Sequence, residues 1–270
     1  MPASPDAGPS PMASPALPAE RPAPGTPLFE IRGLVKRYGR KRILDGLDFD
    51  ILAGECLVIL GRSGSGKSVT LRQLNGLEAP DEGSVRFEGI ELGELSEREL
   101  FPLRRRIAML FQSGALFDSM DVAGNIAFPL REHTDLDDAE IRQRVAERLA
   151  MVNLPGVEGK LPSDLSGGMR KRVALARSLA LDPEVVLFDE PTTGLDPVTS
   201  ATIGRLIRDV QRRLGVTAVV VTHDIPLARR VGDRLAFLAD GRFRFLGTWA
   251  EAEASDDHEL TGFLAGREDE

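Results

Sequence analysis

A glycine-rich run follows directly after a short apolar segment near residue 60. The segment Cys56-Leu57-Val58-Ile59-Leu60 leads into Gly61-Arg62-Ser63-Gly64-Ser65-Gly66-Lys67-Ser68. This G-x-x-x-x-G-K-S spacing is that of the phosphate-binding P-loop, whose glycines let several backbone N–H groups turn toward anionic oxygens. Five consecutive apolar residues suit a strand covered on both faces, and Val69, Leu71 and Leu74 have helical spacing. The pattern favours a nucleotide-binding strand, loop and helix over an ordinary Gly/Ser turn.

The polar groups of this loop have distinct expected roles. A helix that starts near Lys67 would add its positive end to the backbone N–H groups that attract phosphate. Lys67 would reach the β- and γ-phosphates, and the Ser68 hydroxyl would ligate Mg²⁺. The expected nucleotide-contacting residues here are Gly61, Arg62, Ser63, Gly64, Ser65, Gly66, Lys67, Ser68 and Val69.

Charge and composition exclude several classes of protein. The net charge of −8 divides into −1 for residues 1–27, −7 for residues 251–270 and zero for residues 28–250. A neutral body has no long-range field to gather DNA or RNA, so we expect no nucleic-acid partner. The only cysteine, Cys56, lies in an apolar strand, which fits a reducing cytoplasm. No apolar run approaches the ~18 residues that span a bilayer and no signal-peptide pattern is present, so we expect a soluble chain.

The chain divides into three parts by composition. Residues 1–27 hold nine of the 18 prolines and no apolar periodicity, which predicts a disordered Pro/Ala-rich arm. Residues 28–250 alternate helical and β-rich patterns, which favours a layered α/β domain with parallel strands. A helical insert at about residues 113–180 is a candidate subdomain. In the acidic tail, residues 251–270, the spacing of Leu260, Phe263 and Leu264 predicts a short amphipathic helix.

The body's elements are predicted from periodicity and turn residues. Residues 28–39 and 42–51 alternate apolar and polar side chains, as half-buried antiparallel strands do. Further strands are expected at 56–60, as a pair around 85–87, and at 107–111, 185–188 and 217–221. Helices are expected at 95–105, within 121–152, from Ser166 onward and at 197–214. A hairpin over 233–247 would turn at Asp240-Gly241.

Two further motifs carry chemistry. The apolar strand at 185–188 ends in Asp189 and Glu190, where one carboxylate could hold Mg²⁺ and its neighbour could orient or deprotonate a water. A solvated acidic turn is the alternative, and the P-loop in the same chain disfavours it. Ser166-Gly167-Gly168 opens a helix, with Ser166 as N-cap and two glycines that leave backbone N–H groups bare. It is either an ordinary helix start or a second phosphate-binding element.

Together these residues resemble the ATP-binding cassette (ABC) ATPases, over about residues 28–250. The resemblance rests on seven motifs in order: Tyr38, the P-loop at 61–68, Gln112, LSGGM at 165–169, Asp189-Glu190, Gly194-Leu195-Asp196 and His223. It implies an α/β P-loop NTPase fold with a RecA-like core, an antiparallel β subdomain and a helical subdomain. It also implies that the chain hydrolyses ATP with Mg²⁺ as cofactor.

The resemblance assigns roles to individual residues. Tyr38 would stack on adenine, although it could stack equally on guanine. The catalytic residues would be Glu190, which polarises the attacking water, His223, which holds the γ-phosphate, Gln112 and Lys67. The metal would be held by Ser68, Gln112 and Asp189. In this family two cassettes dimerise head to tail, so Ser166, Gly167, Gly168 and Asp196 would act on ATP held by the partner. The simplest partner is a second copy of this chain.

A narrower resemblance lies after Gln112. The chain here resembles the ATPases of MCE-associated (Mla-type) phospholipid transporters of double-membraned bacteria. The resemblance rests on FQSGALF at 111–117, PLREH at 129–133 and a signature that ends in Met169 instead of the usual Gln. This implies a separate membrane permease, an MCE-type lipid-binding partner and a position on the cytoplasmic face of the inner membrane. An amino-acid-type importer is the alternative, and a soluble non-transport ABC protein would normally need two cassettes or a long insertion.

Two apolar sets have open assignments. Leu116, Phe117, Met120 and Phe128 either line the groove that receives a permease helix or fill the helical subdomain's own core. For the tail helix, we hypothesise docking on a neighbouring protein, either the partner ATPase or an accessory subunit. A frayed, solvated terminus is the other interpretation of the tail.

Overall fold

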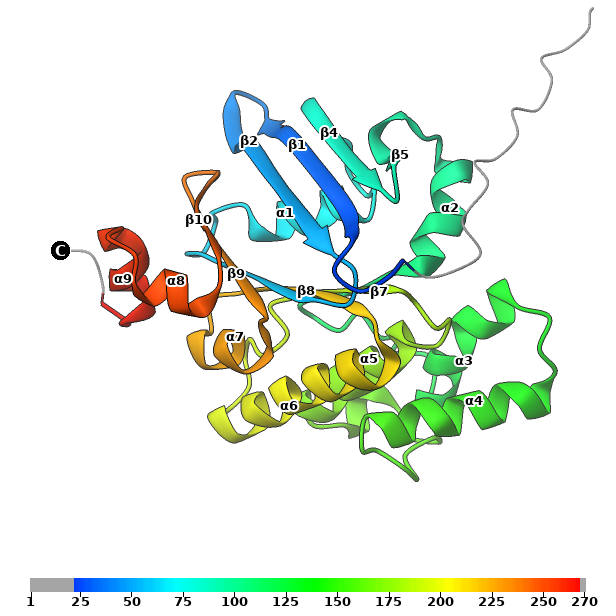
Figure 1. Ribbon diagram of the computed structural model, residues 1–270. Helices are drawn as coiled ribbons and strands as arrows, with labels where there is room; N and C mark the ends of the chain where they lie inside the picture. The colour runs from blue at the N-terminus through cyan, green and yellow to red at the C-terminus, as the bar shows by residue number, and fades with distance from the viewer. Residues whose placement is uncertain (1–21, 268–270) are drawn as a thin grey trace, which may run out of the picture.

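The computed structural model describes residues 22–267. The predicted disordered arm therefore lies outside the described residues, apart from residues 22–27. The described chain forms layers: a six-stranded sheet lies between a smaller antiparallel sheet with α1 on one side and most of the helices on the other (Figure 1). The predicted α/β cassette fold, with antiparallel and helical parts around a central core, is confirmed.

The central sheet has the strand order β10-β9-β3-β8-β7-β6. All neighbouring pairs are parallel except the antiparallel pair β9 and β10. Its strands are β3 (Cys56–Leu60), β6 (Ile107–Leu110), β7 (Val185–Asp189), β8 (Thr217–Thr222), β9 (Arg234–Ala239) and β10 (Arg242–Gly247). Asp240 and Gly241 join β9 to β10 with φ of 48° and 75°, the left-handed pair that a type I′ hairpin turn requires.

Strand β3, which delivers the chain to the P-loop, is buried along its whole length. Cys56, Val58 and Leu60 belong to the core beneath the sheet, whereas Leu57 and Ile59 belong to the core above it. Alternate side chains of a strand point to opposite faces, so a continuous apolar run is needed where both faces are covered. The predicted two-sided burial of this strand is confirmed.

The second sheet is antiparallel and has the order β2-β1-β4-β5. Its inner face packs over α1 and α2, and the rings of Phe29 and Phe87 lie 4.8 Å apart in this core. The strands are β1 (Pro27–Tyr38), β2 (Lys41–Leu52), β4 (Glu82–Phe87) and β5 (Ile90–Glu91). β1 ends at the residue expected to meet the nucleotide base, Tyr38.

The predicted helices are present: α6 has the predicted range, and the ends of α2 differ from the predicted 95–105 by one or two residues. Helices α7 and α8 are not among the predicted helices. α3, α4 and α5 pack on one another, and α5 also contacts β6 and α6. The helices are α1 (Lys67–Leu74), α2 (Glu97–Arg106), α3 (Val122–His133), α4 (Asp138–Met151), α5 (Gly167–Ser178), α6 (Pro197–Leu214), α7 (Ile225–Val231), α8 (Trp249–Glu253) and α9 (His258–Leu264).

The C-terminal segment packs on its own chain. Leu260 of α9 is fully buried in the core beneath the sheet, and the Phe263 ring lies 5.2 Å from the Phe237 ring of β9. Arg244 pairs with Asp257 at 2.9 Å and with Glu259 at 3.0 Å. Within the described residues this helix is therefore not frayed, since Leu260 is covered by the chain's own core. Phe263 and Leu264 stay half-buried, and docking of the segment on a neighbouring protein stays a prediction.

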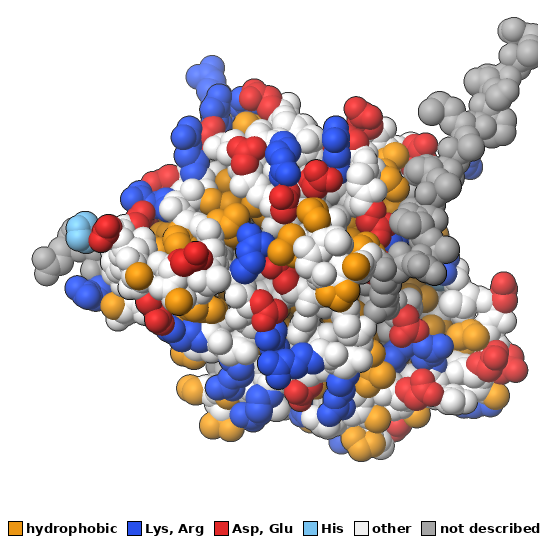
Figure 2. Space-filling model, in the orientation of Figure 1, with side chains coloured by type: hydrophobic (Ala, Val, Ile, Leu, Met, Phe, Trp, Pro, Cys, Tyr) orange, Lys and Arg blue, Asp and Glu red, His pale blue; other side chains and the backbone are white. Residues whose placement is uncertain are grey.

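Charge is mixed over the molecular surface. Acidic and basic side chains are interspersed across the face shown in Figure 2. On this face, the zero net charge of residues 28–250 thus does not arise from one acidic patch balanced by one basic patch. Within residues 22–267, the helices are all too short or too polar to cross a membrane.

Candidate nucleotide-binding site

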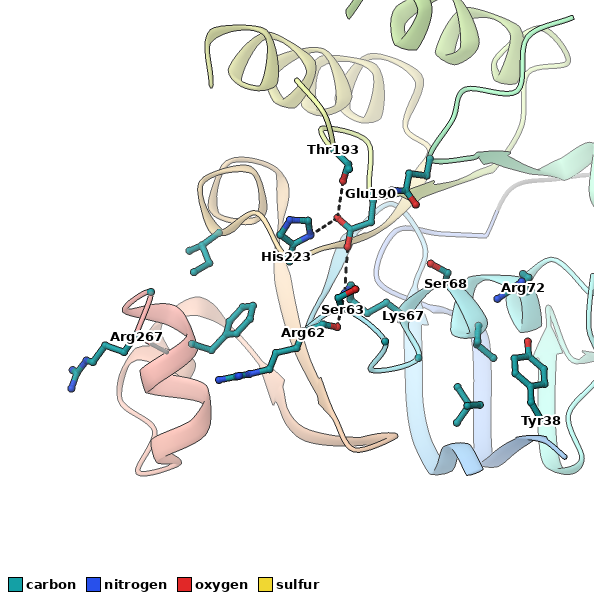
Figure 3. Close-up of a pocket in the computed structure, with 18 residues that line it drawn as sticks. Tyr38, Arg62, Ser63, Lys67, Ser68, Arg72, Glu190, Thr193, His223 and Arg267 are labelled. Carbon is teal, nitrogen blue, oxygen red and sulfur yellow. Dashed lines mark hydrogen bonds and ion pairs between the residues drawn. The ribbon is translucent and has the colours of Figure 1, made fainter. Parts of the chain in front are cut away.

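A cavity of about 1170 Å³ lies at the carboxyl ends of β3, β7 and β8 (Figure 3). Ligand sites in open α/β sheets form at this edge, because the loops that leave the strands converge there. Most of the residues predicted to contact nucleotide line the cavity. They are Tyr38, Arg62, Ser63, Gly64, Gly66, Lys67, Ser68, Val69, Gln112, Glu190 and His223.

Two P-loop glycines lie where a side chain has no room. A Cβ on Gly61 would lie 2.3 Å from the carbonyl oxygen of Leu238. Gly66 has φ of +110°, and its Cβ would lie 2.7 Å from the Leu44 side chain. L-residues rarely adopt such a φ, so glycine is required at this turn into α1 on both steric and backbone grounds.

The Lys67 ammonium is buried within the loop. Its Nζ donates to the carbonyl oxygens of Gly61 at 2.8 Å and Arg62 at 3.0 Å. The same atom lies 3.3 Å from a carboxylate oxygen of Glu190. The P-loop cation and the acid after β7, which are 123 positions apart in the sequence, thus meet in one site.

The Ser68 hydroxyl donates a 2.7 Å hydrogen bond to the Asp189 carboxylate. Burial raises the pKa of Asp189, and the Ser68 hydrogen bond partly opposes this shift. Within residues 22–267 there is no cluster of three or more His, Cys, Asp or Glu side chains that could hold a metal. The two oxygen donors instead fit Mg²⁺, which typically takes one or two protein oxygens, with waters and substrate phosphates completing the shell.

Glu190 contacts three side chains in the cavity, Lys67, His223 and Thr193. Its carboxylate lies 2.9 Å from His223 Nδ1 and accepts a 3.4 Å hydrogen bond from Thr193 (Figure 3). Its backbone has φ of 46°, a left-handed conformation that is uncommon outside glycine. Such outliers persist only where the surrounding structure enforces them and concentrate at functional sites.

Gln112 is held through its backbone by a residue that sequence reasoning missed. The buried Lys171 of α5 donates from Nζ to the Gln112 carbonyl oxygen. Burial lowers the pKa of Lys171, whereas Asp189 and Glu190 act in the opposite direction. The contact spans 59 positions, and the helical pattern of α5 gives no signal for it.

The second predicted phosphate-binding element lies elsewhere. Ser166 is the N-cap of α5 and accepts a 3.3 Å hydrogen bond from the Met169 N–H. A Cβ on Gly168 would lie 2.5 Å from Thr199, so this glycine allows the close approach of α5 to α6. Among the described residues that line the cavity, none is Ser166, Gly167 or Gly168. The cavity within one chain therefore contains only one of the two elements.

Asp196 also has a role within its own chain. Its carboxylate accepts 3.0 Å hydrogen bonds from the N–H groups of Val198 and Thr199 and caps α6. Residues around it line a separate cavity of about 520 Å³ that shares Thr193 and His223 with the nucleotide cavity. Asp196 thus lies beside the site without lining it.

A buried strand that leads into a P-loop, with two acids and a histidine converging on it, defines a P-loop nucleoside triphosphatase. The ABC transporter family matches residues 44–193. The chain is 45% identical over 239 residues to the probable ribonucleotide transport ATP-binding protein mkl of Mycobacterium leprae, covering 88% of this chain and 69% of the relative. This chain belongs to the ABC transporter family, and it is an ATP-binding cassette ATPase.

Another relative and a solved structure add detail. The chain is 40% identical over 239 residues to the intermembrane phospholipid transport system ATP-binding protein MlaF of Escherichia coli K12, covering 88% of this chain and 89% of the relative. Its fold is similar to that of the ATP-binding cassette MJ0796, in a dimeric post-hydrolysis state bound to ADP and Pi. That likeness has a TM-score of 0.75 and 34% identity, and covers 82% of this chain and 98% of the other.

Proposed function

We propose that this chain is the ATP-hydrolysing subunit of a transporter that moves phospholipid or a related lipid across the cell envelope, bound to the cytoplasmic face of the inner membrane. The observation that carries the proposal is the 40% identity to MlaF over 89% of that relative. The segment after Gln112, which resembles Mla-type ATPases, supports it. An amino-acid-type importer is not favoured by these relatives.

Nucleotide binding rearranges the partners of Lys67. Its Nζ lies between two P-loop carbonyls and the Glu190 carboxylate. The β- and γ-phosphates of ATP, which carry more negative charge, take the place of Glu190 as the partner of Lys67. Glu190 is then released to accept a proton from the water that attacks the γ-phosphorus. Tyr38, at one edge of the cavity, would stack on the base.

The remaining groups orient that water and balance charge. His223 Nδ1 and the Thr193 hydroxyl both contact the same oxygen of the Glu190 carboxylate, and His223 would also hold the γ-phosphate. Ser68, Asp189 and Gln112 would hold Mg²⁺, which when bound neutralises charge on the phosphate oxygens. Phosphoryl transfer depends chiefly on positioning and charge stabilisation, so these contacts carry most of the catalytic effect.

The site is completed by a second copy of the chain. The N-terminus of α5 has bare N–H groups at Gly167 and Gly168, yet it does not line the cavity of its own chain. A head-to-tail dimer would place this positive helix end, with Ser166, over the phosphates held by the partner. Asp196, at the start of α6, would lie at the same interface.

A groove of about 290 Å³ is proposed to receive the membrane permease. The exposed rings of Phe117 and Phe128 line it and meet edge to face at 5.0 Å. Asn125 fixes the loop between them, accepting from the Phe117 N–H and donating to three carbonyl oxygens. Leu116 instead packs against the core, and Met120 is half-buried. Of these four residues, Leu116 fits the interpretation as core, and Phe117 and Phe128 are the ones that we assign to the proposed permease groove.

Purification of the full chain with its permease from solubilised membranes tests the cargo. Phospholipid that co-purifies with the complex, and an MCE-type lipid-binding protein among its partners, support the proposal. The other candidate function is ribonucleotide transport, which the name of the Mycobacterium leprae relative suggests. ATPase stimulation by a ribonucleotide other than ATP, without bound lipid, would favour it.

A Phe117→Ala/Phe128→Ala variant should lose the permease but keep its ATP affinity. Phe101→Ala is a matched control, because its exposed ring does not line the groove.

A further inference from the structure

The Tyr38 ring is held at the cavity edge by Glu78, an acid that belongs to none of the seven motifs of the cassette. Its hydroxyl donates to both carboxylate oxygens of Glu78, at 2.8 and 2.7 Å. The residue is 45% exposed, so packing alone does not fix its orientation. Burial and, after it, the Glu78 hydrogen bond raise the pKa of the Tyr38 phenol. The hydroxyl therefore remains a donor throughout the neutral range.

Glu78 is itself tied to the helix that carries the phosphate site. Arg72 of α1 lies with its Nε 3.3 Å from the Glu78 carboxylate, and the Glu78 N–H donates to the Arg72 carbonyl oxygen. Arg72 lines the nucleotide cavity with Tyr38, and the two lie on the same side of it in Figure 3. The phenol, the acid and the α1 guanidinium thus form one chain of contacts.

The segment that carries Glu78 is also bonded to the strand that carries Tyr38. Lys36 Nζ donates to the Ala79 carbonyl oxygen at 2.7 Å. The Asp81 N–H donates to the Val35 carbonyl oxygen at 2.9 Å. Glu78 therefore approaches Tyr38 from a backbone whose position relative to β1 is fixed.

We propose that Glu78 is a positioning residue of the nucleotide site. It holds the Tyr38 ring in the orientation that stacks on the base, and it couples this ring, through Arg72, to the P-loop helix α1. This inference rests on the proposed role of Tyr38 as the base-stacking residue. An exposed aromatic side chain that must be ordered on binding weakens the complex, whereas one already held in place does not. Glu78 acts through this prior ordering and does not itself contact the nucleotide.

Calorimetric titration of the full chain with MgATP tests the proposal. Glu78→Ala should weaken ATP binding about two- to tenfold, the range expected when one side chain must be immobilised. Glu78→Gln keeps an acceptor for the phenol and should restore most of the affinity. Glu82→Ala, which removes an exposed partner of Arg37 outside the cavity, should leave it unchanged. Tripolyphosphate, which lacks a base, should bind wild type and Glu78→Ala equally.

A double-mutant cycle separates positioning from a general structural effect. Tyr38→Phe keeps the ring but removes its donor, so it should match Glu78→Ala, and the double variant should be no weaker than either. Additive losses, an equal loss of tripolyphosphate binding, or unchanged ATP affinity in Glu78→Ala would each overturn the proposal. If Tyr38→Ala binds ATP normally, the base-stacking role fails. If only Tyr38→Ala is impaired, the role of Glu78 fails alone.

Discussion

Replacing Glu190 by glutamine separates its roles as base, ion-pair partner and hydrogen-bond acceptor. The side chain is buried and contacts His223, Thr193 and Lys67 within 3.4 Å. Glutamine has nearly the same shape and keeps one oxygen for Thr193. It cannot take the proton of the attacking water, and it carries no charge that competes with phosphate for Lys67. The substitution should therefore impair the chemical step without impairing binding.

The magnitude follows from the role of a general base. A positioned base contributes about 10²–10⁴-fold to rate, so kcat should fall by that factor, equivalent to about 2.7–5.4 kcal/mol in the activation free energy. The affinity for ATP should be unchanged or higher, because the phosphates no longer displace a carboxylate from Lys67. The variant should also accumulate as an ATP-bound closed dimer.

Phosphate release under saturating MgATP measures kcat, and calorimetry with the same variant measures affinity. Glu253→Gln, which neutralises an exposed acid paired with Arg229, is the matched control and should hydrolyse ATP at the wild-type rate. A Glu190→Gln variant that turns over ATP normally would refute the assignment of the base. An equal loss of binding and turnover would instead make Glu190 a structural residue.

Three further substitutions test the P-loop, the Gln112 contact and the packing of α9. Lys67→Ala should weaken ATP binding by about thirtyfold or more, because a buried charged donor to the phosphates is removed. Unchanged ATP affinity in calorimetry would count against the P-loop role of Lys67. Lys171→Met should lower kcat about ten- to hundredfold at unchanged ATP affinity, since Gln112 loses the contact that positions it, and Lys171→Arg should recover part of the rate. Leu260→Ala should lower the free energy of unfolding by about 2–5 kcal/mol in urea titrations, and an unchanged midpoint would mean that α9 does not pack on the core.

The fold could be predicted in detail because its strongest signals are local. Strand β3 is apolar at every position, and α6 begins at Pro197 and ends before Gly215, as the sequence indicates. The C-terminal helix shows the limit of that reasoning. The spacing of Leu260 and Phe263 predicts an apolar side, but periodicity does not say which surface covers it. The structure supplies that surface from β9 of the same chain.

The site residues also fall into those that sequence motifs identify and those that only the tertiary fold identifies. Residues within motifs, such as Lys67 and Glu190, could be identified from spacing, and the structure brings them together. Glu78 and Lys171 could not, because each acts through a contact that depends on the tertiary fold. Lys171 reaches a backbone carbonyl, which leaves no side-chain partner in the sequence to suggest it.

The cavity of one chain is half of a hydrolysis site, and we propose that Ser166 of a second copy completes it. Sedimentation of Glu190→Gln with MgATP should show a dimer. Adding Ser166→Asp keeps a good N-cap for α5 but sets a carboxylate against the partner's γ-phosphate, whereas Ser166→Asn keeps the cap without the charge. We expect Ser166→Asp to sediment as a monomer that still binds ATP, and Ser166→Asn to remain a dimer. A stable ATP-bound dimer of the Ser166→Asp variant would contradict completion of the site in trans.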